Sequence, residues 1–209
     1  MTPPKGSEFA EFLSSVGGIE AFPHLLRLLA RGEPVALDEL VESEGEAAAD
    51  LARVVRAQPG AEWDSHGRLV GFGLTPRPTD YRLLVAGKTL YTFCAIDTLL
   101  FTVILGEETV VESTCPTTGA PIRLELTPER VRTITPPDAV VCQRLRQDLV
   151  EDLRGNMCDH TNFFASEDAA AEWLAVHPDG LVLSVADGFA QCRAACDQLG
   201  WLSSDVATQ

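Results

Sequence analysis

A nearly all-apolar run in the middle of the chain, from Leu90 to Leu105, constrains the fold more than any other stretch. A single thiol, Cys94, and a single carboxylate, Asp97, interrupt it. The run is short for a bilayer span and carries an acid at its centre, so it predicts a core helix over residues 90–105. Such a helix places the two side chains one turn apart within an apolar wall.

The pairing of a buried thiol with a buried acid permits proton and soft-metal chemistry. A carboxyl group among apolar side chains has a raised pKa and can hold or deliver a proton near neutral pH. A thiol one turn away is a nucleophile or a soft-metal ligand once it ionises. The alternative is a core helix in which Cys94 only packs and Asp97 bonds to backbone.

The balance of charges disfavours several classes of partner. The 209 residues include 16 Lys and Arg against 31 Asp and Glu, a net charge of −15. A chain with this charge repels nucleic acid and anionic membranes. Its N-terminus lacks the apolar core of a secretion signal. We therefore expect a cytoplasmic protein with no nucleic acid and no membrane partner.

The six cysteines are scattered along the chain and include no Cys-x-x-Cys pair. This spacing argues against a zinc ribbon and against a thioredoxin-type dithiol. In a cytoplasm they are expected to be reduced thiols. Cys192 and Cys196 lie one turn apart in an Ala-rich helical segment, and Cys142 falls in an apolar strand-like run. We interpret these three as packing residues.

The first 78 residues have the element order of a winged helix. The pattern predicts helices at residues 8–15, 19–31, 37–41 and 46–57, followed by two strands within residues 61–74. A winged helix usually binds DNA, but here the helix before the strands offers Arg53 and Arg56 among several acids. We expect residues 1–78 to form a winged-helix-like lid domain that does not bind DNA.

Pro76 and Pro78 mark a boundary, after which strands cluster instead of alternating regularly with helices. The patterns predict strands at 80–85, 109–113, 122–126, 139–145, 162–165 and 181–184, a helix start at 127–130, and helices ending near 176 and 199. Residues 79–209 are therefore predicted to form an α+β catalytic domain with antiparallel strands around the central helix.

A second informative stretch runs from Gly155 to Ser166 and holds Cys158 and His160. A Cys this close to a His indicates either a Cys/His nucleophile or a metal site, but the spacing is not specific. The alternative is a surface histidine bonded to backbone. Because no Gly-x-Ser-x-Gly occurs, Ser-His-Asp catalysis has no signature here.

Together the two stretches resemble the organomercurial lyase (alkylmercury lyase) family. The likeness spans almost the whole chain. It lies in Leu90-Tyr91-x-Phe93-Cys94-Ala95-Ile96-Asp97-Thr98-Leu99, Cys158-x-His160-x-x-Phe163-Phe164-Ala165-Ser166, Cys115-x-x-Thr118-Gly119-Ala120-Pro121, residues 29–35 and residues 71–75.

The resemblance implies protonolytic cleavage of carbon–mercury bonds, giving a hydrocarbon and Hg(II), in mercury detoxification. By the same resemblance, Cys94 and Cys158 are the thiolates that take the mercury. Asp97 is the acid that delivers the proton and, with the two cysteines, is expected to contact the mercury of substrate or product. Cys115 is a structural cysteine. No cofactor is expected to be permanently bound, because mercury is substrate and product. External thiols are expected to be needed for release of the product. The acceptor of Hg(II) is then a low-molecular-weight thiol or a mercuric reductase.

Three positions depart from the family pattern as the resemblance gives it. Asp159 stands where another Cys is frequent, Asn162 replaces a usual His, and Thr92 replaces a commonly small residue. None of these changes removes a residue that the mechanism needs. Asn162 can alter the hydrogen bonds around Cys158 and so affect rate and substrate range.

Two other functions compete with the enzyme. A non-catalytic, thiol-based binding protein for mercury or copper(I) would need the thiols but no acid, so Asp97 favours the enzyme. A metal-responsive winged-helix repressor would need to bind DNA, which the acidic charge disfavours.

Overall fold

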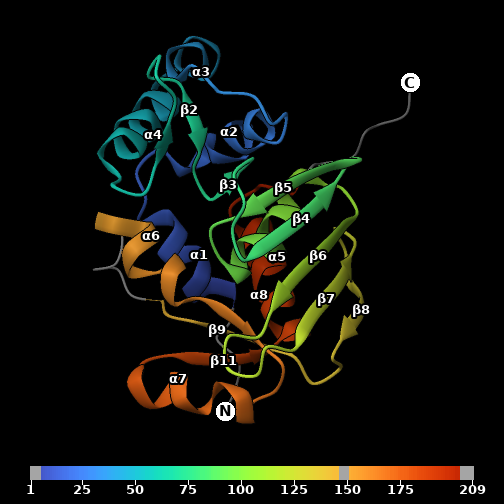
Figure 1. The fold of residues 1–209 in the computed structure, drawn as a ribbon. Coiled ribbons are helices and arrows are strands. Elements are labelled where there is room, and N and C mark those ends of the chain that lie inside the picture. The colour runs from blue at the N-terminus through green and yellow to red at the C-terminus, as the bar shows by residue number, and fades with distance from the viewer. Residues whose placement is uncertain (1–5, 146–150, 203–209) are drawn as a thin grey trace.

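The computed structural model describes residues 6–145 and 151–202, arranged as an N-terminal helical part above an α+β part (Figure 1). This confirms the predicted α+β class. Among the described residues, no helix is both long enough and apolar enough to cross a membrane. The first five residues of the N-terminus, on which the expectation of no secretion signal partly rests, lie outside the described range.

The N-terminal part contains the helices and the hairpin that the sequence predicts. Its elements are α1 (Gly6–Ser14), η1 (Ile19–Ala21), α2 (Phe22–Leu29), α3 (Leu37–Glu44), α4 (Glu46–Ala57), β1 (Glu62–Trp63) and β2 (Leu69–Gly71). The helices bury one face each, which carries Leu40 on α3 and Leu51 and Val55 on α4. Val35 bridges to Leu69 and extends the hairpin by one strand-like position.

The first helix docks on the other end of the chain. We expected it to open the winged helix, but α1 packs against α8 (Val185–Gln198), as Figure 1 also shows. Phe9 and Phe12 are both buried, and their rings stack with centroids 6.5 Å apart. The N-terminal helix therefore contributes to the core of the α+β part.

A six-stranded antiparallel sheet forms the body of the α+β part, in the order β3-β5-β4-β6-β7-β8. The strands are β3 (Leu74–Thr75), β4 (Tyr81–Val85), β5 (Lys88–Thr92), β6 (Thr109–Thr114), β7 (Pro121–Leu126) and β8 (Val131–Thr135). Residues of β4 alternate between buried and half-buried, as expected for a sheet with one covered face. In Figure 1, α5 (Ala95–Leu105) and α8 lie together behind this sheet.

A smaller sheet, ordered β10-β9-β11, carries the segment with the second thiol. All four residues of its central strand β9 are buried, because the strand lies between two neighbours and beneath helices. The remaining elements are β9 (Val140–Gln143), α6 (Leu153–Asn156), η3 (Cys158–His160), β10 (Asn162–Phe164), η4 (Asp168–Ala170), α7 (Ala171–Val176) and β11 (Leu181–Ser184).

The prediction that the central helix starts at residue 90 is wrong. Residues 88–92 form β5, which pairs with β4 around a turn at Ala86-Gly87, and the helix begins only at Ala95. Leu90 and Phe93 are apolar and lead into the helix with no Gly or Pro between them, so periodicity alone cannot find the junction between strand and helix.

The predicted helix start at residues 127–130 is also wrong. These residues form the turn between β7 and β8. The Thr127 hydroxyl accepts hydrogen bonds from the backbone N–H groups of Glu129 and Arg130, 3.2 Å away in each case. The same Thr–Pro pattern that suits a helix cap thus closes a tight turn between strands.

We predict that Gly18→Ala destabilises the protein far more than Gly67→Ala. Both residues have a positive φ, +72° and +74°, which costs a residue with a side chain about 1–2 kcal/mol. A methyl group at Gly18 would also overlap the backbone of Ala47 and Leu51, whereas Gly67 has open space around it. That overlap should lower the free energy of unfolding by about 1–3 kcal/mol more, the usual cost of overpacking.

Urea unfolding of the two variants beside the native protein measures this difference. Equal losses of unfolding free energy would mean that Gly18 is required only for its backbone conformation, and not for the approach of η1 to α4.

Candidate active site

A reciprocal cap at the start of α5 holds the first thiol and the acid together. Cys94 is the N-cap residue, in extended conformation, and Asp97 is the third residue of the helix. The Cys94 backbone N–H donates to Asp97 Oδ2 at 3.2 Å, and the Cys94 side chain accepts from the Asp97 backbone. This is the arrangement of a capping box, with a thiol in the place usually taken by a hydroxyl.

The second thiol comes from η3, more than sixty residues further along the chain. Backbone hydrogen bonding fixes this segment, because the Ala95 N–H donates to the Thr161 carbonyl at 3.2 Å. The Cys94 and Cys158 sulfurs and a carboxylate oxygen of Asp97 all lie within 4.8 Å of one another, and all three residues are buried. The structure thus brings together the three site residues named from the sequence.

The environment of Asp97 keeps its proton available near neutral pH. Burial raises the pKa of its carboxyl group to about 7, and hydrogen bonds from Cys94 and from the backbone of Phe93 reduce this rise. This behaviour is expected of an acid held in apolar surroundings.

Both thiols are held in their protonated form until something displaces the proton. Burial, followed by the hydrogen bond with Cys158 and the Asp97 charge, raises the pKa of Cys94 well above its usual value. For Cys158, the hydrogen bond with Cys94 lowers the pKa, but burial and the charges of Asp97 and Asp159 raise it overall. A soft metal that binds the sulfurs can displace these protons.

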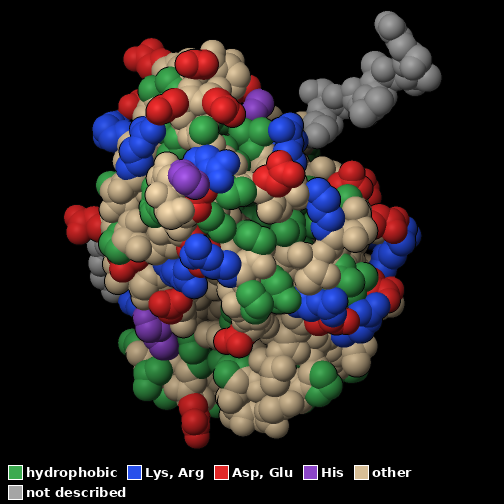
Figure 2. Space-filling model, turned by 45° about the horizontal axis from the view of Figure 1, so that its top comes forward, with side chains coloured by type: hydrophobic (Ala, Val, Ile, Leu, Met, Phe, Trp, Pro, Cys, Tyr) green, Lys and Arg blue, Asp and Glu red, His purple; other side chains and the backbone are tan. Residues whose placement is uncertain are grey.

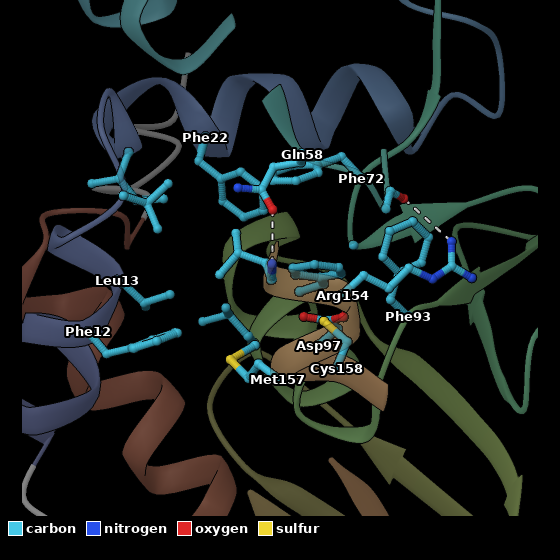
Figure 3. Close-up of a pocket in the computed structure, with 17 residues that line it drawn as sticks. Phe12, Leu13, Phe22, Gln58, Phe72, Phe93, Asp97, Arg154, Met157 and Cys158 are labelled. Carbon is cyan, nitrogen blue, oxygen red and sulfur yellow. Dashed lines mark hydrogen bonds between the residues drawn. The ribbon is translucent and has the colours of Figure 1, made fainter. Parts of the chain in front are cut away.

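An apolar pocket of about 640 Å³, counting its open mouth, lies against the acid and the second thiol. Figure 3 shows side chains from both parts of the protein converging above Asp97 and Cys158. Cys94 itself is fully buried. The apolar lining consists of Phe12, Leu13, Val16, Ile19, Phe22, Gly60, Phe72, Gly73, Phe93, Leu100, Phe101, Leu153 and Met157, and Gln58 and Arg154 add polar groups.

Arg154 and Gln58 are site residues that the sequence analysis did not identify. The Arg154 guanidinium carbon lies 4.0 Å from the centroid of the Phe93 ring, and Arg154 Nη1 lies 3.0 Å from a carboxylate oxygen of Glu62. Gln58 Oε1 accepts from the Leu153 N–H at 2.9 Å. These contacts attach the segment before Cys158 to the N-terminal part. The Arg154–Glu62 and Gln58–Leu153 contacts join residues more than ninety positions apart, and Phe93 is also distant from Arg154 in the sequence, so no local pattern signals them.

Two of the departures from the family pattern form hydrogen bonds beside the site. The Tyr81 hydroxyl donates to Asn162 Oδ1 at 2.7 Å, and it also lies 3.2 Å from the Thr161 carbonyl. The Thr92 hydroxyl donates to the Cys94 carbonyl at 2.8 Å. Tyr81 therefore links the strand after Cys158 to β4, a link that the sequence did not reveal.

The other cysteines and His160 lie outside the three-ligand group. All of these cysteines are buried. Burial raises the pKa of Cys142 and of Cys196 to about 12, and that of Cys192 well above its usual value. The imidazole of His160 lies against the ring of His177, with centroids 5.1 Å apart.

Cys115 differs from these cysteines because its sulfur accepts several hydrogen bonds. Burial raises the pKa of its thiol, but the Thr118 hydroxyl and the backbone of Ala165, Thr118 and Thr117 outweigh it, so the pKa is lowered. The Cys115 side chain is buried beside the turn that joins β6 to β7.

Comparison with known proteins shows the family to which the chain belongs. A family model described as alkylmercury lyase matches residues 74–196, and one described as the helix-turn-helix domain of alkylmercury lyase matches residues 15–73. The chain belongs to the alkylmercury lyase family. An alkylmercury lyase of Bacillus cereus is 40% identical over 168 residues, which cover 80% of this chain and 77% of that protein.

More distant members of the alkylmercury lyase family align over a similar span. Those of Streptomyces lividans and Pseudomonas putida are both 38% identical, covering 84% and 87% of this chain and 81% and 87% of their own lengths. A crystal structure of the mercury-bound form of MerB2 superposes with a TM-score of 0.74 at 20% identity, over 95% of this chain and 98% of that one. The superposition shows that the two proteins share a fold.

We predict that Asp97→Asn changes how stability depends on pH. The carboxyl group titrates near 3.8 when unfolded and near 7 in the folded protein, so between these values the folded state binds more protons. The free energy of unfolding of the native protein therefore falls as pH rises through this window. Asn does not titrate, so the variant should gain about 2–3 kcal/mol relative to the native protein between pH 5 and pH 8.

Urea unfolding of both proteins at the two pH values measures the gain. A difference that stays constant with pH would mean that Asp97 titrates in the folded protein near its ordinary value.

Proposed function

We propose that the protein is an organomercurial lyase that cleaves carbon–mercury bonds by protonation and gives a hydrocarbon and Hg(II). The observation that carries this proposal is the carboxyl group of Asp97, with a pKa of about 7, held within 4.8 Å of two sulfurs. Membership of the alkylmercury lyase family supports it. A non-catalytic mercury or copper binder would need the two thiols but no acid of this strength.

The first step is capture of the mercury by Cys94 and Cys158. Mercury is soft, so sulfur outcompetes water and carboxylate for it. Each sulfur gives up its proton as its bond to the metal forms, and Asp97 is close enough to accept one of these protons. Two electron-rich sulfurs on the metal then make the carbon bound to it more basic.

The second step is delivery of the proton to carbon. Asp97 protonates the carbon as the carbon–mercury bond breaks, and the bonding electron pair forms the new carbon–hydrogen bond. Of the two protons that the thiols release, one ends in the hydrocarbon and the other leaves with the original counter-ion of the substrate. The apolar pocket suits the organic group and excludes the water that would compete for the acid.

Residues 1–78 are proposed to be a lid over this site, and residues 79–209 the catalytic domain. The Phe22 ring lies 5.9 Å from that of Phe101 on α5, so the N-terminal part contacts the central helix. Residues of α1 and α2 line the pocket. The lid role accounts for these contacts without any need for DNA.

The charges of the lid also support a role other than DNA binding. Arg53 pairs with Asp50 at 2.8 Å, and Arg56 pairs with Asp38 at 2.7 Å. Both arginines lie on α4, the helix that a winged helix would present to DNA. On the face in Figure 2, basic and acidic side chains are interspersed.

Release of the product is proposed to depend on external thiols. Hg(II) held by two thiolates is bound tightly, so a low-molecular-weight thiol or the cysteines of a mercuric reductase must accept it. No permanently bound cofactor takes part in this scheme. A reducing cytoplasm would keep Cys94 and Cys158 available.

The thiol assignment predicts which cysteine variants lose activity. Cys94→Ser and Cys158→Ser should each abolish benzene release from phenylmercury in the presence of excess thiol, because a hydroxyl is a poor ligand for mercury. The control is Cys192→Ala with Cys196→Ala, which removes two buried sulfurs outside the site and should retain most of the activity.

Gas chromatography of benzene, with circular dichroism to confirm folding, gives the result. A folded double variant that has lost turnover would mean that the wrong thiols have been assigned.

A further inference from the structure

Cys158 borders two cavities of opposite character. One is the apolar pocket that it shares with Asp97. The other is a groove of about 740 Å³, counting its open mouth, which Asp97 does not line. Phe93 and Arg154 line both cavities and lie between them as a partition. The groove residues are Pro78, Thr79, Asp80, Tyr81, Phe93, Arg154, Cys158, Asp159 and Asn162.

The groove carries charges of both signs close to the second sulfur. Asp80 and Asp159 are exposed carboxylates on its wall. Arg154 supplies a guanidinium group, whose Nη1 already pairs with Glu62 at 3.0 Å, so its other N–H groups are the ones open to a ligand. Asp159 and Arg154 lie near enough to act on the Cys158 thiol in opposite directions. Such a lining does not suit the organic group of an organomercurial, but it matches a small molecule with both an ammonium and a carboxylate group.

The two sulfurs differ in how they can be reached. Cys94 is 0% exposed and Cys158 is 6% exposed. Cys158 lines the groove, whereas Cys94 lines neither cavity. A molecule that arrives through the groove therefore meets the Cys158 side of any bound mercury first.

We propose that this groove docks the small zwitterionic thiol, such as cysteine or a cysteine-containing peptide, that removes Hg(II) from Cys158. The inference rests on the proposed lyase function. Asp80 and Asp159 attract the ammonium group of the thiol, and Arg154 attracts its carboxylate. The organic group of the substrate occupies the apolar pocket, so substrate and acceptor approach the metal from different sides of the partition.

The exchange on Cys158 is balanced and involves no redox change. The incoming thiol sulfur forms a bond to mercury while the bond from mercury to the Cys158 sulfur breaks. The proton of the incoming thiol ends on the Cys158 sulfur. A second thiol then displaces Cys94 in the same way, and Hg(II) leaves as a complex with two small thiols.

The test measures the two halves of the reaction separately. Native protein, Asp80→Asn and the control Asp138→Asn are each given one equivalent of phenylmercury, and benzene is measured. Asp138 is an exposed carboxylate between β8 and β9 that does not line the groove. The mercury-loaded proteins are then mixed with cysteine or with N-acetylcysteine, which lacks the ammonium group. Protein-bound mercury is measured after timed gel filtration, with rates corrected for thiolate fraction.

The native protein and the control should release mercury faster to cysteine than to N-acetylcysteine. The Asp80→Asn variant should release it roughly 1.5–5-fold more slowly to cysteine, the scale of one partly exposed ion pair. Its release to N-acetylcysteine should not slow, and its benzene release should be unchanged. If the Asp80→Asn variant keeps the native preference for cysteine while benzene release is normal, the groove proposal is overturned and the lyase function stands. If the native protein releases no benzene, the lyase function itself fails.

Discussion

The reciprocal cap between Cys94 and Asp97 is the interaction on which the rest of the site depends. It sets the start of α5 and holds a thiol and a carboxyl group at the positive end of that helix, where an ionised thiol is stabilised. The backbone on either side is held by the Phe93 N–H, which donates to the Gly73 carbonyl at 2.8 Å, and by the Thr92 hydroxyl. These hydrogen bonds hold the junction between β5 and α5, where a carboxylate oxygen of Asp97 lies within 4.8 Å of both sulfurs.

Burial of the Asp97 carboxyl group lowers the stability of the folded protein, and the surrounding apolar core offsets this loss. An acid whose pKa is raised by burial destabilises the folded protein above its ordinary pKa. The two buried thiols are protonated at neutral pH in the folded and the unfolded state alike, so their raised pKa values lower stability only in alkaline solution. The compensation comes from the apolar core around α5, where Leu99, Ile104 and their neighbours are fully buried. The same low polarity that makes the site costly to fold makes its proton available for transfer.

Closure over the site comes from segments that are distant in the sequence. Arg154 pairs with Glu62 and stacks on Phe93, so three segments meet at one guanidinium group. The N-terminal helices supply several of the apolar side chains that line the pocket, among them Phe12, Leu13 and Phe22 in Figure 3. Residues of α1, η1 and α2 line the apolar pocket, and Phe93 lies between this pocket and the polar groove.

The sequence predicts the elements that local patterns determine and misses those that depend on tertiary contact. The helix at residues 46–57 and the strand at 181–184 were predicted with their observed bounds, because period and turn signals agree there. The start of α5 was misplaced because Leu90, in β5, and Phe93 join the apolar residues of the helix in one run that no Gly or Pro interrupts. That Cys158 belongs beside Asp97 came from the family resemblance, since no periodicity connects positions so far apart. The roles of Tyr81 and Arg154 depend on partners 81 and 92 residues away.

The most direct test of the account is the behaviour of Asp97→Asn in a single turnover with phenylmercury. Both thiols remain in this variant, so it should still bind the organomercurial with one equivalent per chain. Release of benzene should fall by ~10²–10⁴-fold, the usual contribution of a general acid. Release at nearly the native rate would mean that the proton comes from another group and that Asp97 only caps the helix.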